Sequence, residues 1–126
     1  MDRIRICPGG IMDATQMNQD YDPNIAIEFI FKKAPKYAKA KGQLAELEAF
    51  KSSLKAIQMA KSGEQSLGAQ EREAYRSPEY QELCKAIGIA TEQVELLKYQ
   101  LEAAKLRWET WRTQQANDRQ IERMLK

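Results

Sequence analysis

The most regular pattern in this sequence runs through residues 80–111, YQELCKAIGIATEQVELLKYQLEAAKLRWETW. Apolar side chains recur there at alternating steps of three and four without a miss, at Tyr80, Leu83, Ile87, Ala90, Val94, Leu97, Leu101, Ala104, Trp108 and Trp111. This spacing covers about four and a half heptads and is typical of a coiled-coil seam. Ser77 and Pro78, a capping residue and a first-turn proline, precede it. We therefore predict a helix from residue 78 to past residue 112, with Leu97 and Leu101 buried.

An earlier stretch predicts a second long helix, over residues 23–62. Asp22 and Pro23 repeat the combination of a cap and a first-turn proline. One face then carries Leu44, Leu47, Phe50, Leu54 and Ile57 at steps of three and four. Residues 25–31 also alternate as a strand would, and we favour the helix over that alternative. Pro35 removes one backbone hydrogen bond, so we expect a kink or a break there.

The segment between these helices holds Gly63 and Gly68, which end the first helix, and a predicted short helix over residues 69–76. Matched helix lengths and a connection of about fifteen residues favour an antiparallel hairpin of two long coiled-coil-like helices, forming one all-α domain over residues 22–126. If residue 62 lies opposite residue 78, residue 32 lies opposite residue 108. Residues 1–21 lack a helical period and are predicted to form a flexible N-terminal arm. Alternatively, Ile4 and Ile6 form a short strand.

Composition limits the function classes. The chain has 126 residues, room for one ordinary domain, and a formal charge of only +2, so a nucleic-acid site has to be a local patch. There is no histidine, no phosphate-binding glycine loop and no metal-ligand spacing. Carboxylate pairs such as Glu71 with Glu73 fit solvated surface charge better than acid–base chemistry. We therefore expect a protein that is not an enzyme and has no cofactor and no metal site.

The sequence shows neither a targeting signal nor a disulfide framework. No run of about 18 apolar residues is present and the first residues do not resemble a signal peptide, so we expect no membrane contact and a cytoplasmic location. Cys7 and Cys84 have no paired spacing and are interpreted as free thiols.

Two helices leave much of each apolar stripe uncovered, so we also predict a homo-oligomer.

A candidate binding site emerges from the charge pattern. Five lysines lie within ten residues, and no acidic residue occurs between Glu28 and Glu46. The hairpin register brings this cluster to the same end as two arginines and two tryptophans, and such a mixture suits single-stranded nucleic acid. The predicted site consists of Lys32, Lys33, Lys36, Tyr37, Lys39, Lys41, Arg107, Trp108, Trp111 and Arg112. A solvated lysine face and tryptophans that belong to the core are the alternatives.

Three segments carry a resemblance to a known group. They are Ala34–Lys41 (APKYAKAK), Ala69–Tyr75 (AQEREAY) and Trp111–Thr113 followed by Ala116 and Asn117. Together they resemble small helical proteins of tailed phages and prophages that are found near recombination genes, and the match runs from about residue 23 to the end of the sequence. The layout is also similar to UvsY-type recombination mediators. That resemblance implies a helical oligomer that binds single-stranded DNA and contacts a recombinase.

Three hypotheses follow. The first is a phage recombination accessory protein, a mediator that binds single-stranded DNA and a recombinase or annealing protein. The second is a phage protein-interaction module, an inhibitor or anti-defence protein that docks on a host complex without nucleic acid. The third is a structural coiled-coil spacer.

Overall fold

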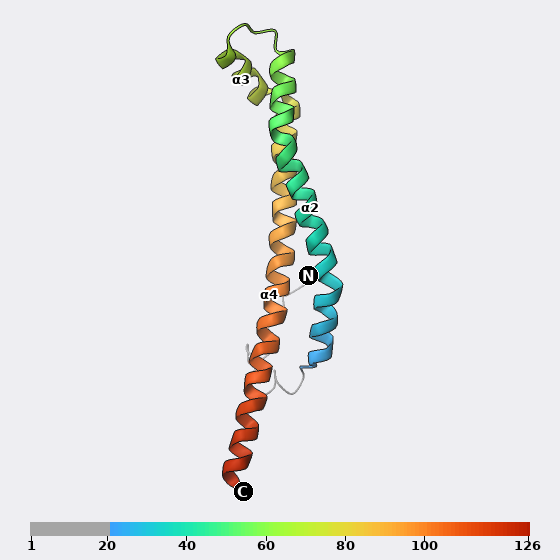
Figure 1. Cartoon of the computed structure of the whole chain (residues 1–126), viewed down its shortest axis with the longest axis vertical. Helices are drawn as coiled ribbons and strands as arrows, with labels where there is room; N and C mark the ends of the chain where they lie inside the picture. Colours follow the sequence, from blue (N-terminus) through green and yellow to red (C-terminus); the bar gives the residue numbers. More distant parts are fainter. Residues whose placement is uncertain (1–20) are drawn as a thin grey trace, which may run out of the picture. The chain divides into compact units, whose positions relative to one another are not determined.

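The chain forms three α-helices in the part that the structure, a computed structural model, describes, which is residues 21–126. In chain order they are α2 (Pro23–Lys61), α3 (Leu67–Arg76) and α4 (Pro78–Leu125), with 39, 10 and 48 residues (Figure 1). Between residues 21 and 126 there is no strand, so the all-α class is confirmed over this range. The predicted arm lies outside the described residues except for Tyr21.

Helix α2 begins at the predicted cap. The backbone N–H of Asn24 donates to Asp22 Oδ1 at 2.9 Å, and Pro23 occupies the first helical position, where its missing N–H costs nothing. Residues 25–31 are helical, so the helical interpretation is confirmed and the strand alternative is wrong.

We expected a kink or a break at Pro35, and the break does not occur, because α2 runs without interruption through this residue. Proline removes the N–H that would bond to the carbonyl of Phe31. Both residues are exposed, with Phe31 75% accessible, so water can satisfy the carbonyl that the proline leaves unpaired. The rest of the helix supplies enough bonds to continue past it.

The connection from α2 to α3 is built from capping contacts. Ser62 donates from its backbone N–H and from Oγ to the carbonyl of Met59, at 3.3 and 2.8 Å. Gly63 then adopts a φ of +73°, the left-handed conformation that commonly ends a helix. Helix α3 starts two residues earlier than predicted, because Ser66 accepts from the N–H of Ala69 and acts as its N-cap.

Ser77 serves two helices at once. Its Oγ donates to the carbonyl of Ala74 at 2.7 Å, which closes α3, and accepts from the N–H of Tyr80 at 3.3 Å, which opens α4. Pro78 is the first residue of α4, as predicted. Helix α4 also continues through its polar end to Leu125.

The chain divides into two compact units, which are described separately. The central unit contains residues Phe31–Glu102, and thus parts of α2 and α4 and all of α3. The terminal unit contains, among the described residues, 21–30 and Ala103–Lys126.

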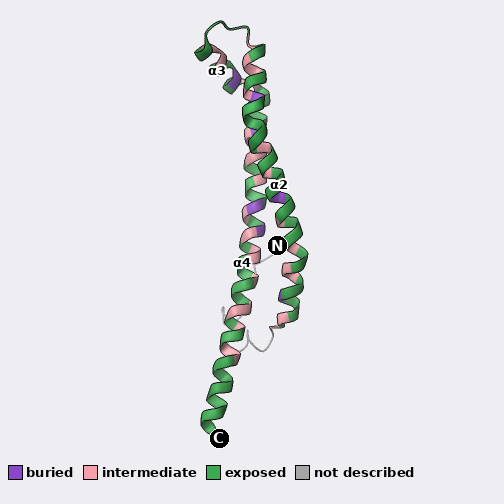
Figure 2. Cartoon of the chain, viewed as in Figure 1, coloured by how far each residue is buried: buried purple, intermediate pink, exposed green. Residues whose placement is uncertain are grey.

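Two apolar clusters form the core of the central unit (Figure 2). In the first, Ala40 of α2 meets Val94 and Leu97 of α4, with Tyr37 and Leu44 packed around them. In the second, Leu54 meets Tyr80 and Leu83, with Leu47, Cys84 and Ile87 packed around them. Since the later residue of α2 meets the earlier residues of α4, the two helices run in opposite directions in this unit.

The register in the central unit differs from the predicted one. Pairing residue 62 with residue 78 would put Leu54 opposite residue 86, whereas it packs against Tyr80 and Leu83, about one helical turn away. The shift arises because the last turns of α2 face α3. Lys55 Nζ lies 3.4 Å from Glu71 Oε1, and α3 also buries Ala74 completely.

The predicted seam is the inward side of α4. Tyr80, Leu83, Val94 and Leu97 are buried and its other six members are half-buried. Leu97 is 4% exposed as expected, whereas Leu101 is only half-buried. On α2, Phe50 and Ile57 remain 47% and 44% exposed, so that stripe is covered on one side only. Within residues 21–126, no helix is both long and apolar enough to cross a membrane.

Candidate nucleic-acid interface

The lysine group consists of Lys32, Lys33, Lys36, Tyr37, Lys39 and Lys41, all on α2 in the central unit. Lys33 and Tyr37 are half-buried and the other four are exposed. Successive residues of an α-helix turn by about 100°, so Lys32, Lys36 and Lys39 share one face, with spacings of four and three. Lys33 and Lys41 lie outside that face. Three cations of the lysine group, Lys32, Lys36 and Lys39, can therefore contact phosphates of the same nucleic-acid strand.

Tyr37 has a structural contact as well as a predicted binding role. Its ring packs against the cluster of Ala40, Val94 and Leu97, and Lys41 Nζ lies 5.6 Å from the ring centroid. The half-buried ring is thus held between the core and a cation. Only its uncovered part is open to a base.

The arginine–aromatic group lies on α4 in the terminal unit and consists of Arg107, Trp108, Trp111 and Arg112. The guanidinium carbon of Arg112 lies 4.8 Å from the Trp108 ring centroid, one helical turn along the same helix. Both tryptophans are half-buried and both arginines are exposed. The tryptophans are therefore neither fully buried core residues nor fully open platforms.

Tyr21 joins this group, which the sequence analysis did not anticipate. Its ring centroid lies 6.0 Å from that of Trp111 at 56°, and the guanidinium carbon of Arg107 lies 4.8 Å from the Tyr21 ring centroid. Tyr21 is the last residue of the predicted arm and directly precedes the Asp22 cap. An apolar residue at that position often packs onto the chain and fixes how it enters the helix, which is the signal that would have found it.

The Tyr21 hydroxyl sits in a covered environment. Its oxygen is buried and has no hydrogen-bond partner among the described residues. Burial raises the pKa of Tyr21 above its ordinary value, partly opposed by the positive charge of Arg107, while Asp22 raises it further. The neutral phenol is therefore favoured, and the ring acts as an aromatic surface for Arg107 and Trp111.

The two groups belong to different units. The structure brings Arg107, Trp111 and Tyr21 together, and Arg112 together with Trp108. It brings Lys32, Lys36 and Lys39 onto one face of α2. The convergence of the lysine group with the arginine–aromatic group stays a prediction.

Stacked arginines have a specific chemical use. A guanidinium whose face lies on an aromatic ring keeps its N–H edges free, and these edges match the geometry of a phosphate. The neighbouring ring provides a surface on which an unpaired base can stack. The arginine–aromatic group can thus hold a phosphate and a base beside each other.

Other polar groups that the sequence singled out have local partners. Glu71 pairs with Lys55 at 3.4 Å, and Glu73 pairs with Arg76 at 3.3 Å. Cys84 is a free, half-buried thiol packed against the cluster of Leu54, Tyr80 and Leu83, whereas Cys7 lies outside the described residues.

Comparison with known proteins yields no match to a family model, a curated protein or a solved structure.

Proposed function

We propose that this chain binds single-stranded nucleic acid without catalysing a reaction, and that it acts as an accessory or mediator protein in phage recombination. The arginine–aromatic group carries the proposal. Arg112 lies on Trp108, Arg107 lies on Tyr21, and Tyr21 contacts Trp111, all within the terminal unit. A surface that alternates cations and rings is the combination that unpaired bases on a charged backbone require.

The lysine group supports the same function. Lys32, Lys36 and Lys39 are exposed and share one face of α2, and Glu28 and Glu46 are the nearest acidic residues on either side of the lysine group. Such a face attracts phosphates through counterion release, which depends on salt and not on sequence. In this proposal the lysine group adds affinity and the arginine–aromatic group adds preference for unpaired bases.

The wider architecture belongs to the proposal too. The opposed directions of α2 and α4 in the central unit support an antiparallel coiled-coil-like hairpin. We further propose that the protein is a homo-oligomer in the host cytoplasm and contacts a recombinase or annealing protein. The resemblance to small phage proteins near recombination genes supports that setting.

Fluorescence anisotropy with labelled poly-dT at two salt concentrations tests the proposal. The test variant carries Lys32→Gln, Lys36→Gln and Lys39→Gln. The matched control carries the same change at Lys51, Lys61 and Lys85, which are also exposed. We expect weaker binding and a salt dependence flatter by roughly 0.7 per lost phosphate contact in the test variant only.

Tryptophan fluorescence provides the second reading. The chain has two tryptophans, and both belong to the arginine–aromatic group. If bases stack on Trp108 or Trp111, adding poly-dT quenches their emission. Unchanged affinity in the lysine variant together with unquenched emission would overturn the proposal.

A protein-interaction module is the second candidate. It is favoured by large apolar side chains that α4 leaves accessible in the central unit, namely Ile89, Leu96 and Tyr99. Absence of any salt-sensitive poly-dT binding by the wild type would favour this candidate over the first.

A further inference from the structure

Helix α4 carries a second row of apolar side chains that the first seam does not use. In the central unit, Ile89, Leu96 and Tyr99 are 69%, 53% and 61% exposed. Their spacings of seven and three are those of coiled-coil a and d positions. At about 100° per residue this row lies roughly 150° around the helix from buried Val94 and Leu97. A helix with apolar groups on two sides needs a partner on each.

The second observation is a hollow on α4 in the terminal unit. Leu106, Glu109, Thr110, Thr113 and Gln114 line a shallow hollow of about 290 Å³. The first four have the spacing i, i+3, i+4 and i+7, which is the four-residue hole that accepts a knob from a facing helix. Leu106 is 62% exposed. Thr110 Oγ1 already donates to the Leu106 carbonyl at 2.9 Å, so its hydroxyl needs no partner in the hollow.

The sequence of α4 follows one heptad register over these residues. Leu96, Ala103, Thr110 and Asn117 take the a positions, and Tyr99, Leu106 and Thr113 take the d positions. We call the residues at these a and d positions the second seam. We propose that α4 of a second copy of this chain docks on the second seam, parallel and in register. Glu92, at the preceding d position, interrupts the apolar row between Ile89 and Leu96, so the second seam begins at Leu96.

The pattern of charged and polar side chains beside the seam favours a second copy as the occupant. In a parallel coiled coil, the g position of one helix faces the e position five residues later in its partner. Three glutamates at g are each followed five residues later by a side chain that can donate: Glu95 by Gln100, Glu102 by Arg107, and Glu109 by Gln114. An antiparallel pair would instead face glutamates with glutamates, which is repulsive.

Asn117 supports the same orientation. A buried asparagine at an a position is tolerated when it meets its own counterpart, since one amide donates to the other. That match arises when two copies of α4 lie parallel and in register. A helix of a different sequence would have to supply a polar group at the same level.

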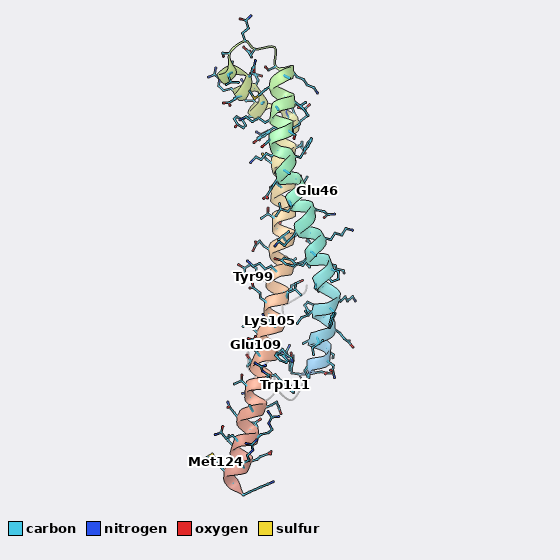
Figure 3. All side chains as sticks on the ribbon, in the orientation of Figure 1. Glu46, Tyr99, Lys105, Glu109, Trp111 and Met124 are labelled. Carbon is cyan, nitrogen blue, oxygen red and sulfur yellow. The ribbon has the colours of Figure 1, made fainter. Side chains whose placement is uncertain are left out.

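The second seam leaves Trp108, Trp111 and Arg112 of the arginine–aromatic group free, whereas Arg107 takes an e position at its edge. Trp108 and Trp111 take f and b positions of this register, away from a and d. Figure 3 shows Glu109 and Trp111 on different sides of α4 in the terminal unit. The dimer would therefore carry two copies of the proposed binding surface, and its test does not depend on nucleic acid.

Solution mass tests the surface. Sedimentation equilibrium at micromolar concentration should give about 29 kDa for the wild type, twice the chain mass of 14.5 kDa. Leu96→Glu places a carboxylate in the seam and should raise the dimer dissociation constant by at least about tenfold. Ile57→Glu is the matched control, because Ile57 is 44% exposed on α2 and lies outside the seam. Circular dichroism checks that both variants keep their helices.

Cross-linking tests the orientation. In a Cys7→Ser and Cys84→Ala background, Leu96→Cys should form an intermolecular disulfide under mild oxidation, because parallel a positions meet within the reach of a disulfide. Ile57→Cys should not. A monomeric wild type, or a dimer that Leu96→Glu leaves intact, would overturn the proposal that the second seam is the dimer interface. A dimer that Leu96→Glu dissociates but Leu96→Cys does not cross-link overturns the parallel arrangement.

Discussion

The central and terminal units continue the same helices but are stabilised by different interactions. Among residues 21–126, the buried apolar residues other than Ala26 all lie in the central unit. There α2, α3 and α4 each contribute to the core. In the terminal unit, Tyr21 contacts Trp111 and Arg107, Trp108 contacts Arg112, and residues 116–126 are exposed throughout.

This difference assigns the two units different tasks. The seam of α4 keeps its three-and-four spacing from Tyr80 to Trp111, yet it is more deeply buried in the central unit than in the terminal unit. Apolar burial that excludes water stabilises a fold, whereas half-buried rings with exposed cations remain able to bind. We interpret the central unit as the scaffold, which also carries the lysine group, and the terminal unit as the carrier of the arginine–aromatic group.

Truncating the scaffold core should have the largest effect on stability. Leu97 is 4% exposed in the first central cluster, so Leu97→Ala should lower the free energy of unfolding by about 2–5 kcal/mol. Leu101→Ala, at a half-buried position of the same seam, should cost less. Urea unfolding followed by circular dichroism measures both. Equal costs at the two positions would contradict the difference in burial.

The double cap at Ser77 should give the next largest effect. Ser77→Ala removes the acceptor at the start of α4 and the donor at the end of α3, so we expect a loss of about 1–2 kcal/mol. Ser66→Ala is the matched control, because Ser66 caps α3 alone. The same urea unfolding measures both variants. A loss at Ser66 equal to that at Ser77 would show that only one of the two Ser77 contacts matters.

Much of this fold was predictable because local signals agreed with one another. Capping aspartate and serine with first-turn prolines placed the starts of α2 and α4, and the seam spacing predicted which side of α4 faces inward. Of the two outcomes expected at Pro35, the break was wrong, because a proline can lie inside a long helix when its neighbours are open to water. The register was also wrong by about one turn. No local pattern shows that the last turns of α2 pack against α3 instead of α4.

The candidate site was less predictable than the fold. Charge and aromatic content identify residue types, but the sequence alone did not show that Arg107 lies on Tyr21, because that contact joins residues 86 positions apart. The phase of the lysines, by contrast, follows from helical spacing alone. The second seam of α4 was also present in the sequence. We could propose it as a docking surface only because the structure shows Leu96 and Tyr99 exposed while Val94 and Leu97, on the other side of the helix, are buried.

An alkaline titration probes how α3 is held in the central unit. Hydrogen bonding to Tyr75, and the charge of Glu71, raise the pKa of Lys55 above its ordinary value of 10.5. Protonated Lys55 therefore stabilises the fold fully below pH 10.5, and this contribution disappears as pH rises through the folded pKa. The stability difference between wild type and Lys55→Met should stay constant up to about pH 10 and shrink above it. A constant difference up to pH 12 would contradict the assignment.

The smallest effect is expected at Tyr21, where the terminal unit is probed without disturbing its ring contacts. Tyr21→Phe keeps the surface for Arg107 and Trp111 and removes a buried hydroxyl that has no partner among the described residues. Removing an unpaired buried polar group is neutral or favourable, so the free energy of unfolding should stay constant or rise by up to about 1 kcal/mol. Because burial raises the pKa of Tyr21, the tyrosine of the unfolded chain ionises first as pH rises above 10.0, so the wild type loses stability in alkali and the advantage of phenylalanine should grow there. Tyr21→Ala, which also removes the ring, should instead destabilise the unit by about 0.5–1.5 kcal/mol.

Tryptophan fluorescence during urea unfolding reports on this unit selectively, because Trp108 and Trp111 both belong to it. A clear loss of stability in Tyr21→Phe would show that the hydroxyl makes a favourable contact, and the terminal unit would then be held by more than rings and cations.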